Sequence, residues 1–213
     1  MYTALIPVKS LNEAKSRLAT HLTQAQRAAL MLDMLHHVLC ILQASNALER
    51  ISVVSSDRRV LEQIQAWGAH ARVEEETGHN PALTSAATRE LAEGTTALLT
   101  ISADLPLLQV NDIHGMIEQS KRSVVVLAPS QDRTGTNALL VHPPLALPYT
   151  FGLGSLQRYI SESRIRQLSS DLYTSVGLGF DIDTVDDLVT FRHNHLSLRP
   201  SCYPPFSPLF FNI

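Results

Sequence analysis

The chain is poor in cysteine, in net charge and in long apolar runs, and each shortage argues against a class of protein. Cys40 and Cys202 are its only cysteines, and Cys40 lies on an apolar helical pattern that favours a core thiol over a disulfide. A net charge of -3 provides no basic face for nucleic acid. No apolar stretch is long enough to span a bilayer, and no basic amphipathic helix suits a membrane surface. We therefore expect neither nucleic-acid nor membrane partners.

The amino terminus also lacks the charged and then apolar pattern of a signal peptide, because a strand-like run begins at Tyr2. A cytoplasmic protein is the resulting expectation. Apolar residues make up 45% of the 213 residues, which indicates one folded domain, expected over residues 1–197. Residues 198–213 form a tail rich in proline and phenylalanine, which cannot continue a helix. Its phenylalanines predict packing on the body or on a partner, so a homodimer is possible.

Strand-like and helix-like segments alternate through the first two thirds of the sequence. Continuous apolar strands separated by helices predict an α/β protein with a mostly parallel sheet covered on both faces. A capping box at Thr23 and Gln26 predicts the start of the first long helix. The predicted strands cover residues 2–6, 50–54, 70–74, 96–102, 123–127, 136–142 and 179–183, and the predicted helices cover 23–43, 58–67, 81–93, 111–119, 156–161 and 185–193.

Three cations follow the first predicted strand within nine residues: Lys9, Lys15 and Arg17. A cationic loop at the carboxyl end of the first strand of an α/β sheet is where nucleotide phosphates usually bind. Such cations also offset the charge that develops as a triphosphate reacts. A solvated basic loop is the alternative interpretation. Because the Walker and dinucleotide glycine patterns are absent, those two classes of phosphate site are disfavoured.

Two acidic sites follow predicted strands. Asp104 comes after the strand at residues 96–102, at the same edge of the sheet as the cationic loop, although an aspartate there can also simply form a turn. Asp181 belongs to the last predicted strand. Two carboxylates from separate strand ends are a common arrangement for holding Mg²⁺, which prefers hard oxygen ligands. Asp104 and Asp181 are therefore the predicted metal ligands.

Asp183 is a weaker candidate for the metal. In a strand it would face the same side as Asp181, with Ile182 pointing into the core. However, Asp183 or Thr184 can instead cap the following helix, since Thr184 with Asp187 resembles a capping box. For this reason Asp181 is preferred as a ligand.

Two loops, at residues 133–137 and 151–155, are rich in glycine and hydroxyl groups. Glycines let backbone amides approach an anion closely, and threonine and serine add side-chain donors. Ser155 can also cap the helix that follows, whose amino terminus attracts anions. Ordinary turns are the alternative. Asn80 precedes another predicted helix, where it can act as a cap or contact a base or ribose.

Taken in order, these motifs resemble the guanylyltransferases of deazaflavin coenzyme (F-420) biosynthesis. The archaeal members are 2-phospho-L-lactate guanylyltransferases, and the bacterial members are phosphoenolpyruvate guanylyltransferases. The resemblance spans about residues 2–195. The segments that carry it are residues 7–18, 104–106, 135–137, 151–155 and 181–184. One departure is His79, which stands where the family more often has leucine.

The resemblance implies a Rossmann-like α/β/α sandwich of the nucleotide-diphospho-sugar transferase type. It further implies that Asp104 and Asp181 hold Mg²⁺ and that the cationic loop receives GTP. The implied contacts of the phosphorylated three-carbon acid are Thr136, Gly152 and Ser155. The implied nucleotide contacts are Pro7, Lys9, Ser10, Lys15 and Asn80, and the implied catalytic residues are Lys15, Arg17, Asp104 and Asp181.

The implied reaction is in-line attack of the acceptor phosphate on the α-phosphorus of GTP, with release of pyrophosphate. A phosphomonoester is already largely dianionic at pH 7, so it attacks without a general base. Phosphoenolpyruvate is the acceptor implied for the bacterial branch. Two alternatives stay open: a cytidylyl- or uridylyltransferase acting on another phosphorylated acceptor, and a catalytically silent nucleotide-binding regulator.

Overall fold

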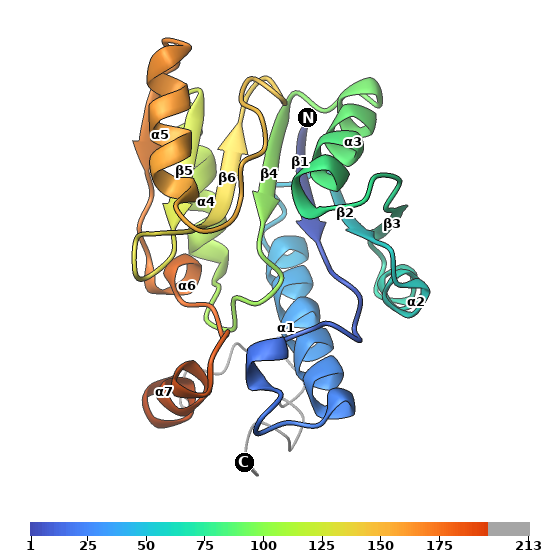
Figure 1. Ribbon diagram of the computed structural model, residues 1–213. Coiled ribbons are helices and arrows are strands. Elements are labelled where there is room, and N and C mark those ends of the chain that lie inside the picture. Colours follow the sequence, from blue (N-terminus) through green and yellow to red (C-terminus); the bar gives the residue numbers. More distant parts are fainter. Residues whose placement is uncertain (196–213) are drawn as a thin grey trace.

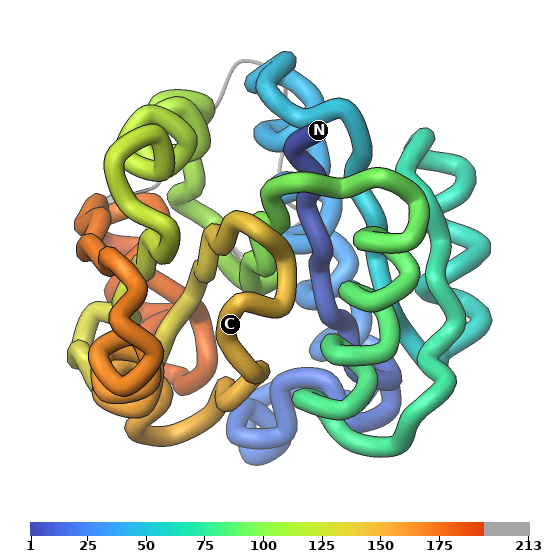
Figure 2. The backbone as a smooth tube through the Cα atoms, turned by 90° about the horizontal axis from the view of Figure 1, so that it is seen from above, coloured from blue at the N-terminus to red at the C-terminus, as the bar shows by residue number. Residues whose placement is uncertain are grey.

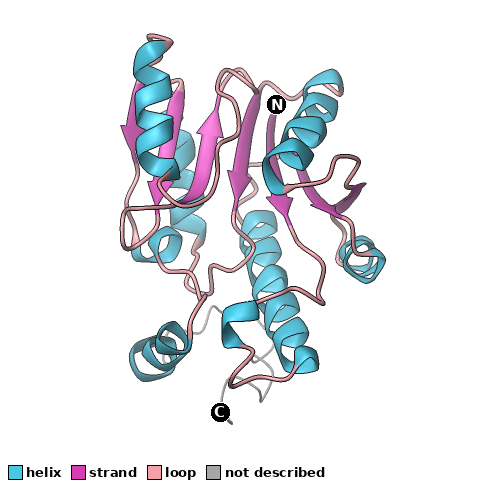
Figure 3. Cartoon of the chain, viewed as in Figure 1, coloured by secondary structure: helices cyan, strands magenta, loops and turns pink. Residues whose placement is uncertain are grey.

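The computed structural model describes residues 1–195, which form three layers, a sheet between two layers of helices (Figures 1 and 3). The predicted tail at residues 198–213, with Cys202, lies outside the described residues. The strands are β1 (Tyr2–Pro7), β2 (Arg50–Ser55), β3 (His70–Val73), β4 (Ala97–Ile101), β5 (Val125–Pro129), β6 (Thr136–Val141) and β7 (Ser170–Leu172). The helices are η1 (Ser16–Leu18), α1 (Gln24–Ala44), α2 (Arg58–Ala66), α3 (His79–Ala92), α4 (Val110–Ser120), α5 (Ser155–Ile165), α6 (Val176–Gly179) and α7 (Val185–His195).

The seven strands form one sheet in the order β3-β2-β1-β4-β6-β5-β7. Strand β1 pairs in parallel with β2 and β4, whereas β6 runs antiparallel to both of its neighbours, β4 and β5. The carboxyl ends of β1 and β4 and the amino end of β6 therefore meet at one edge of the sheet, the lower edge in Figure 1. Loops that leave this edge can bring side chains from distant parts of the sequence together.

The two faces of the sheet are covered because successive strand residues point to opposite sides. Ala4 and Ile6 of β1 belong to the large core cluster that contains buried side chains of α1, α2 and α4. Leu5, between them, packs in a second cluster with Leu83 of α3. A third cluster joins β5 and β6 to Tyr159 of α5. Figure 2 shows α1 and α4 on one side of the sheet and α3 and α5 on the other.

Most of the predicted elements are confirmed, including a mostly parallel sheet and the capping box of Thr23 and Gln26 at the start of α1. The helix predicted from residue 81 begins earlier, at His79, because Pro81 sits in the first turn, where an amide has no intrahelical partner. The short strand β7 and the short helix α6 were not predicted. Among the described residues, none of the helices has the length and apolar character needed to cross a bilayer.

The strand predicted at residues 179–183 is wrong. Residue 179 ends α6, and residues 180–184 pass the end of the sheet without joining it. The strand beside them, β6, already pairs with β4 and β5 on its two sides, so no hydrogen-bonding edge is open there. A single backbone contact, from the Ile182 amide to the Asp104 carbonyl at 3.4 Å, links the segment to the loop after β4.

Candidate functional site

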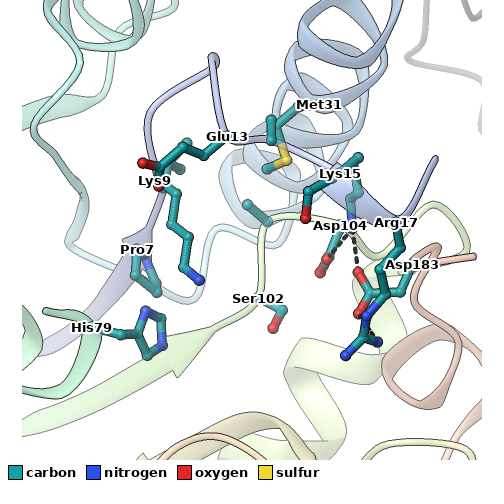
Figure 4. A pocket seen from close by; sticks show the side chains of 14 residues that line it. Pro7, Lys9, Glu13, Lys15, Arg17, Met31, His79, Ser102, Asp104 and Asp183 are labelled. Carbon is teal, nitrogen blue, oxygen red and sulfur yellow. Dashed lines mark hydrogen bonds and ion pairs between the residues drawn. The ribbon is translucent and has the colours of Figure 1, made fainter. Parts of the chain in front are cut away.

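The predicted cationic loop and the predicted carboxylates do meet at the edge of the sheet. The loop after β1 supplies Lys15, the loop after β4 supplies Asp104, and the segment after α6 supplies Asp183 (Figure 4). The Lys15 ammonium lies 2.5 Å from the Asp104 carboxylate and 2.9 Å from that of Asp183. These contacts join residues that are far apart in the sequence, so they depend on the tertiary fold.

Lys15 is held in an unusual way. Its side chain is only 4% exposed, and its backbone adopts the left-handed conformation, with φ of 50°, which non-glycine residues rarely adopt. Backbone strain of this kind persists only where the surroundings impose it, and it is common at functional sites. Burial lowers the pKa of Lys15, but the negative charges of Asp104 and Asp183 outweigh that effect and raise it above its ordinary value. The ammonium is therefore a permanent positive charge in this cluster.

Asp104, Asp181 and Asp183 form a carboxylate triad. One oxygen atom from each lies within 4.8 Å of the others, and all three side chains are half-buried. The predicted convergence of Asp181 and Asp183 is thus confirmed, with Ile182 fully buried between them. Asp183, which we ranked lower as a possible helix cap, belongs to the cluster. Thr184 makes the capping box instead, because its hydroxyl and the carboxylate of Asp187 exchange hydrogen bonds with each other's amides.

The three carboxylates of the triad outnumber the one buried cation beside them, Lys15. Burial, followed by the charge of Asp104, raises the pKa of Asp181 to about 6. Burial also acts to raise the pKa of Asp183, but the charge of Lys15 and its hydrogen bond outweigh burial and lower it. Three carboxylates that face a single buried ammonium are a suitable donor set for a hard divalent cation such as Mg²⁺. The residues present therefore fit the predicted metal.

Asn137, at the start of β6, positions one of these carboxylates. Its side-chain amide is almost fully buried and donates hydrogen bonds to the Asp181 carboxylate at 3.1 Å and to the Leu178 carbonyl at 3.0 Å. It thereby ties the segment after α6 to the sheet. Sequence reasoning placed Asn137 in a glycine- and hydroxyl-rich motif but gave it no role of its own. The motif was the available signal, whereas the partner depends on the fold.

Two cavities adjoin across this cluster. The first, of about 340 Å³, is lined by residues that include Pro7, Lys15 and Asp104. The second, of about 900 Å³, lies on the other side and is lined by residues that include Thr136, Gly152, Ser155 and Asp181. Lys9, Arg17 and Asp183 line both cavities. Two ligands can therefore bind next to each other with the carboxylates between them.

The two glycine- and hydroxyl-rich loops, at residues 133–137 and 151–155, line the second cavity. The Ser155 hydroxyl donates to the Thr136 hydroxyl at 3.0 Å, and the Ser155 amide donates to the Gly152 carbonyl at 2.9 Å. The prediction that Ser155 caps α5 is wrong, because Ser155 is the first helical residue and the cap is Gly154 in the left-handed conformation. The Ser155 amide is thus occupied, but Gly154 has no side chain to cap the helix, so the next amides in the first turn of α5 stay available to an anion.

The remaining predicted residues have varied positions. Lys9 is exposed. The Arg17 side chain is 73% exposed, and its guanidinium lies 3.5 Å from the Asp183 carboxylate. The Ser10 hydroxyl donates to Asp57 at 3.3 Å, which anchors the cationic loop. The Asn80 side chain exchanges two hydrogen bonds with the backbone of Phe151, so it joins α3 to the second cavity. Asn80 is not the cap of α3, which is Gly78, and its contact with a nucleotide stays a prediction.

Comparison with known proteins gives a consistent result. A family described as "Guanylyl transferase CofC like" matches residues 2–194. The phosphoenolpyruvate guanylyltransferase of Rubrobacter xylanophilus is 39% identical over 186 residues, with 87% of this chain and 90% of that protein covered. The 2-phospho-L-lactate guanylyltransferase of Methanothermobacter thermautotrophicus is 34% identical, with 87% and 81% covered.

A solved structure shows the same fold. A putative nucleotide-diphospho-sugar transferase from Desulfovibrio desulfuricans superposes with a TM-score of 0.75 and covers 95% of this chain and 92% of that chain. Its sequence identity is 18%, so this likeness concerns the fold alone. The predicted architecture of the nucleotide-diphospho-sugar transferase type is confirmed.

Proposed function

The chain belongs to the CofC-like family of guanylyl transferases, and from this premise we propose that it transfers GMP from GTP to the phosphate of phosphoenolpyruvate. Pyrophosphate is the second product, and the reaction serves deazaflavin coenzyme (F-420) biosynthesis. The observation that carries the proposal is the carboxylate triad with Lys15, located between two adjoining cavities. One cavity receives the nucleotide, and the other receives the phosphorylated acid.

The cavity for the phosphorylated acid provides hydrogen-bond donors, and the reaction needs no general base there. Thr136 and Ser155, together with the uncapped amides of α5, bind the acceptor phosphate. This phosphate is largely dianionic at pH 7, so it attacks the α-phosphorus of GTP directly and no side chain has to remove a proton. The P–O bond to the β-phosphate breaks as the new P–O bond forms, and the displaced electron pair leaves on pyrophosphate.

The donor side supplies charge. Lys15 and Arg17 stabilise the departing pyrophosphate, and Lys9, which lines both cavities, contacts the polyphosphate. Mg²⁺ held by Asp104, Asp181 and Asp183 would neutralise the charge that the two anionic substrates bring to the site. Asn137 keeps Asp181 directed toward this position through its hydrogen bond.

The acceptor is assigned from the relatives rather than from the cavity. The relative from Rubrobacter, at 39% identity, is named for phosphoenolpyruvate, and the archaeal one, at 34%, is named for 2-phospho-L-lactate. These acids differ by few atoms, and discrimination between such similar ligands rests on fine pocket geometry. Phosphoenolpyruvate is therefore our first choice.

The test is pyrophosphate release from GTP, CTP and UTP, each with phosphoenolpyruvate, 2-phospho-L-lactate or 3-phosphoglycerate, in the presence of Mg²⁺. We expect GTP with phosphoenolpyruvate to give the highest kcat/KM. Because the product can be labile, the reaction should be coupled to the next enzyme of the pathway. Preference for CTP or UTP would support the cytidylyl- or uridylyltransferase alternative, and nucleotide binding without turnover would support a silent regulator.

A further inference from the structure

We infer that Glu74, at the end of β3, selects guanine by accepting hydrogen bonds from the N1–H and 2-amino groups of the base. This inference rests on the proposed function, because it deals with the donor nucleotide of the same reaction. It assigns base selection to one side chain that lies outside the triad and outside both cavities described above.

A third cavity, of about 350 Å³, continues from the first one. It is enclosed by the loop after β1, the ends of β2 and β3 and the start of α3. The two cavities share Pro7, Val8, Lys9, Glu13 and His79, so together they form one elongated site. A nucleotide whose phosphates lie near Lys15 and Asp104 can therefore extend its base into the third cavity, which neither of these two residues lines.

The walls of the third cavity suit a flat base with polar edges. Pro7, Val54 and Ala82 provide apolar surface, and Glu74 provides a carboxylate. Guanine presents two adjacent donors, N1–H and the 2-amino group, which match the two oxygens of one carboxylate. Adenine has an acceptor at N1, and uracil has a single N–H between two carbonyls, so neither can form this pair. A carboxylate here therefore favours guanine.

The Glu74 side chain has no other assigned task. Its backbone amide donates to the Ser55 carbonyl at 3.0 Å, which fixes the position of the residue at the end of the sheet. The side chain is half-buried, and among residues 1–195 it forms no hydrogen bond or ion pair. Its neighbour Glu75, in contrast, pairs with Arg89 at 2.9 Å and with Ser85 at 3.1 Å. A half-buried carboxylate without a cation is well placed to accept donors from a ligand.

Glu13 is the rival carboxylate, since it also lines the third cavity. It belongs to the cationic loop and lines the first cavity too, where Figure 4 shows it on the same loop as Lys9. It is therefore at the phosphate end of the site, where a carboxylate repels the nucleotide. Glu74 lines the third cavity and not the first, at the end away from the triad.

The test compares GTP with ITP, which lacks only the 2-amino group, in the wild type and in Glu74→Gln. For the wild type we expect kcat/KM to be about 10- to 100-fold higher with GTP than with ITP, the range of one charge-assisted hydrogen bond. In Glu74→Gln we expect kcat/KM for GTP to fall about 100-fold, mainly through KM, because the base is remote from the reacting atoms. The preference for GTP over ITP should shrink to about twofold or less.

Glu76→Gln is the matched control, because it removes the same charge from an exposed residue of the same loop that does not line the third cavity. This variant should leave kcat/KM for GTP, kcat/KM for ITP and their ratio unchanged. An unchanged GTP-to-ITP ratio in Glu74→Gln would overturn the inference, as would loss of the ratio in Glu13→Gln instead. Thermal melting of each variant verifies that it is folded.

Calorimetric binding of GDP and IDP to the same variants separates this inference from the proposed function. If no pyrophosphate is released from GTP and phosphoenolpyruvate, the proposed function fails, yet the GDP-to-IDP affinity ratio still tests Glu74. A ratio that is lost in Glu74→Gln and kept in Glu76→Gln supports the inference, and a ratio kept in both overturns it.

Discussion

Two clusters of partly buried charge lie in different parts of this molecule, and they differ in charge balance. At the edge formed by β2, β3 and α3, the fully buried Glu90 contacts the guanidinium groups of Arg50 at 2.9 Å and of Arg72 at 3.0 Å, and Glu93 pairs with both arginines. Two acids there face two bases. At the candidate site, three acids face the single buried ammonium of Lys15, with Arg17 mostly exposed.

The difference separates a stabilising cluster from a binding cluster. Planar guanidinium groups satisfy the oxygens of Glu90 with fixed hydrogen bonds, so nothing further is needed there. The triad, in contrast, has three carboxylates beside one buried ammonium, and the pKa of Asp181 is raised to about 6, first by burial and then by the charge of Asp104. We infer that the balanced cluster stabilises the fold, whereas the unbalanced cluster costs stability and serves to bind a cation and substrates.

The largest expected effect comes from the unbalanced cluster. Asp104→Asn should lower kcat by at least about 1000-fold, because it removes one of the three carboxylates of the proposed metal site. The amide oxygen of the introduced asparagine can still accept a hydrogen bond from Lys15, so the free energy of unfolding should change by no more than about 1 kcal/mol. Pyrophosphate release and thermal melting measure the two effects. If the variant retained a tenth or more of the activity, the assignment of Asp104 as a metal ligand would be contradicted.

The balanced cluster should show the reverse behaviour. Glu90→Gln leaves two arginines beside a buried neutral group and should lower the free energy of unfolding by about 3 kcal/mol. The kcat of the folded variant should be unchanged, because Glu90 lines none of the three cavities. Urea unfolding is the measurement, and Glu93→Gln, at a more exposed position, is the control, with a loss of about 1 kcal/mol or less. A catalytic defect without loss of stability would contradict the division of roles.

Asp181→Asn should raise the free energy of unfolding, whereas Glu90→Gln should lower it. The carboxyl of Asp181 has a pKa of about 6 in the folded chain, raised first by burial and then by Asp104, against an ordinary value of 3.8. The folded state therefore binds this proton more tightly than the unfolded state, and the wild type loses stability as the pH rises between these two values. Asparagine has no proton to lose, so the variant should be about 1–3 kcal/mol more stable above pH 6, and equal to the wild type at pH values below 3.8.

Urea unfolding at pH 5 and pH 8 in the presence of a chelator measures this effect, since bound metal would mask it. A growing advantage of the variant between these two pH values agrees with the unbalanced charge. Equal stability at both would mean that Asp181 carries no penalty in the folded protein.

The smallest expected effect is at a hydroxyl group of the second cavity. Thr136→Val keeps the shape of the side chain but removes the hydroxyl that accepts from Ser155. The KM for phosphoenolpyruvate should rise about tenfold, the equivalent of one lost hydrogen bond, with little change in the KM for GTP. Steady-state kinetics with each substrate varied in turn make the measurement. A rise in the KM for GTP alone would place Thr136 in the donor cavity.

Much of the site was predictable because it depends on local rules. Lys15 and Asp104 both follow apolar strands, and the parallel arrangement of such strands brings their carboxyl ends to one edge. The convergence of Asp181 and Asp183 was predicted through a strand that does not form. The two carboxylates nevertheless converge, with Ile182 fully buried between them.

Other features could not be predicted, because they depend on which distant groups the fold brings together. The pairing of Lys15 with Asp104 joins residues 89 positions apart, and that of Asn137 with Asp181 joins residues 44 apart. Asn80 looked like a helix cap, but its partner is the backbone of Phe151, across the site. The edge strand β7 is short and exposed, so it lacks the apolar pattern by which the other strands were identified.

The most direct test of the central claim is Mn²⁺ binding, followed by electron paramagnetic resonance, in the wild type, Asp104→Asn and Glu90→Gln. Mn²⁺ serves as a probe for Mg²⁺ because both prefer oxygen ligands. The account predicts that the wild type and folded Glu90→Gln bind one ion with similar affinity and that Asp104→Asn binds at least about tenfold more weakly. Equal affinity in the wild type and Asp104→Asn, or loss of binding in Glu90→Gln, would contradict it.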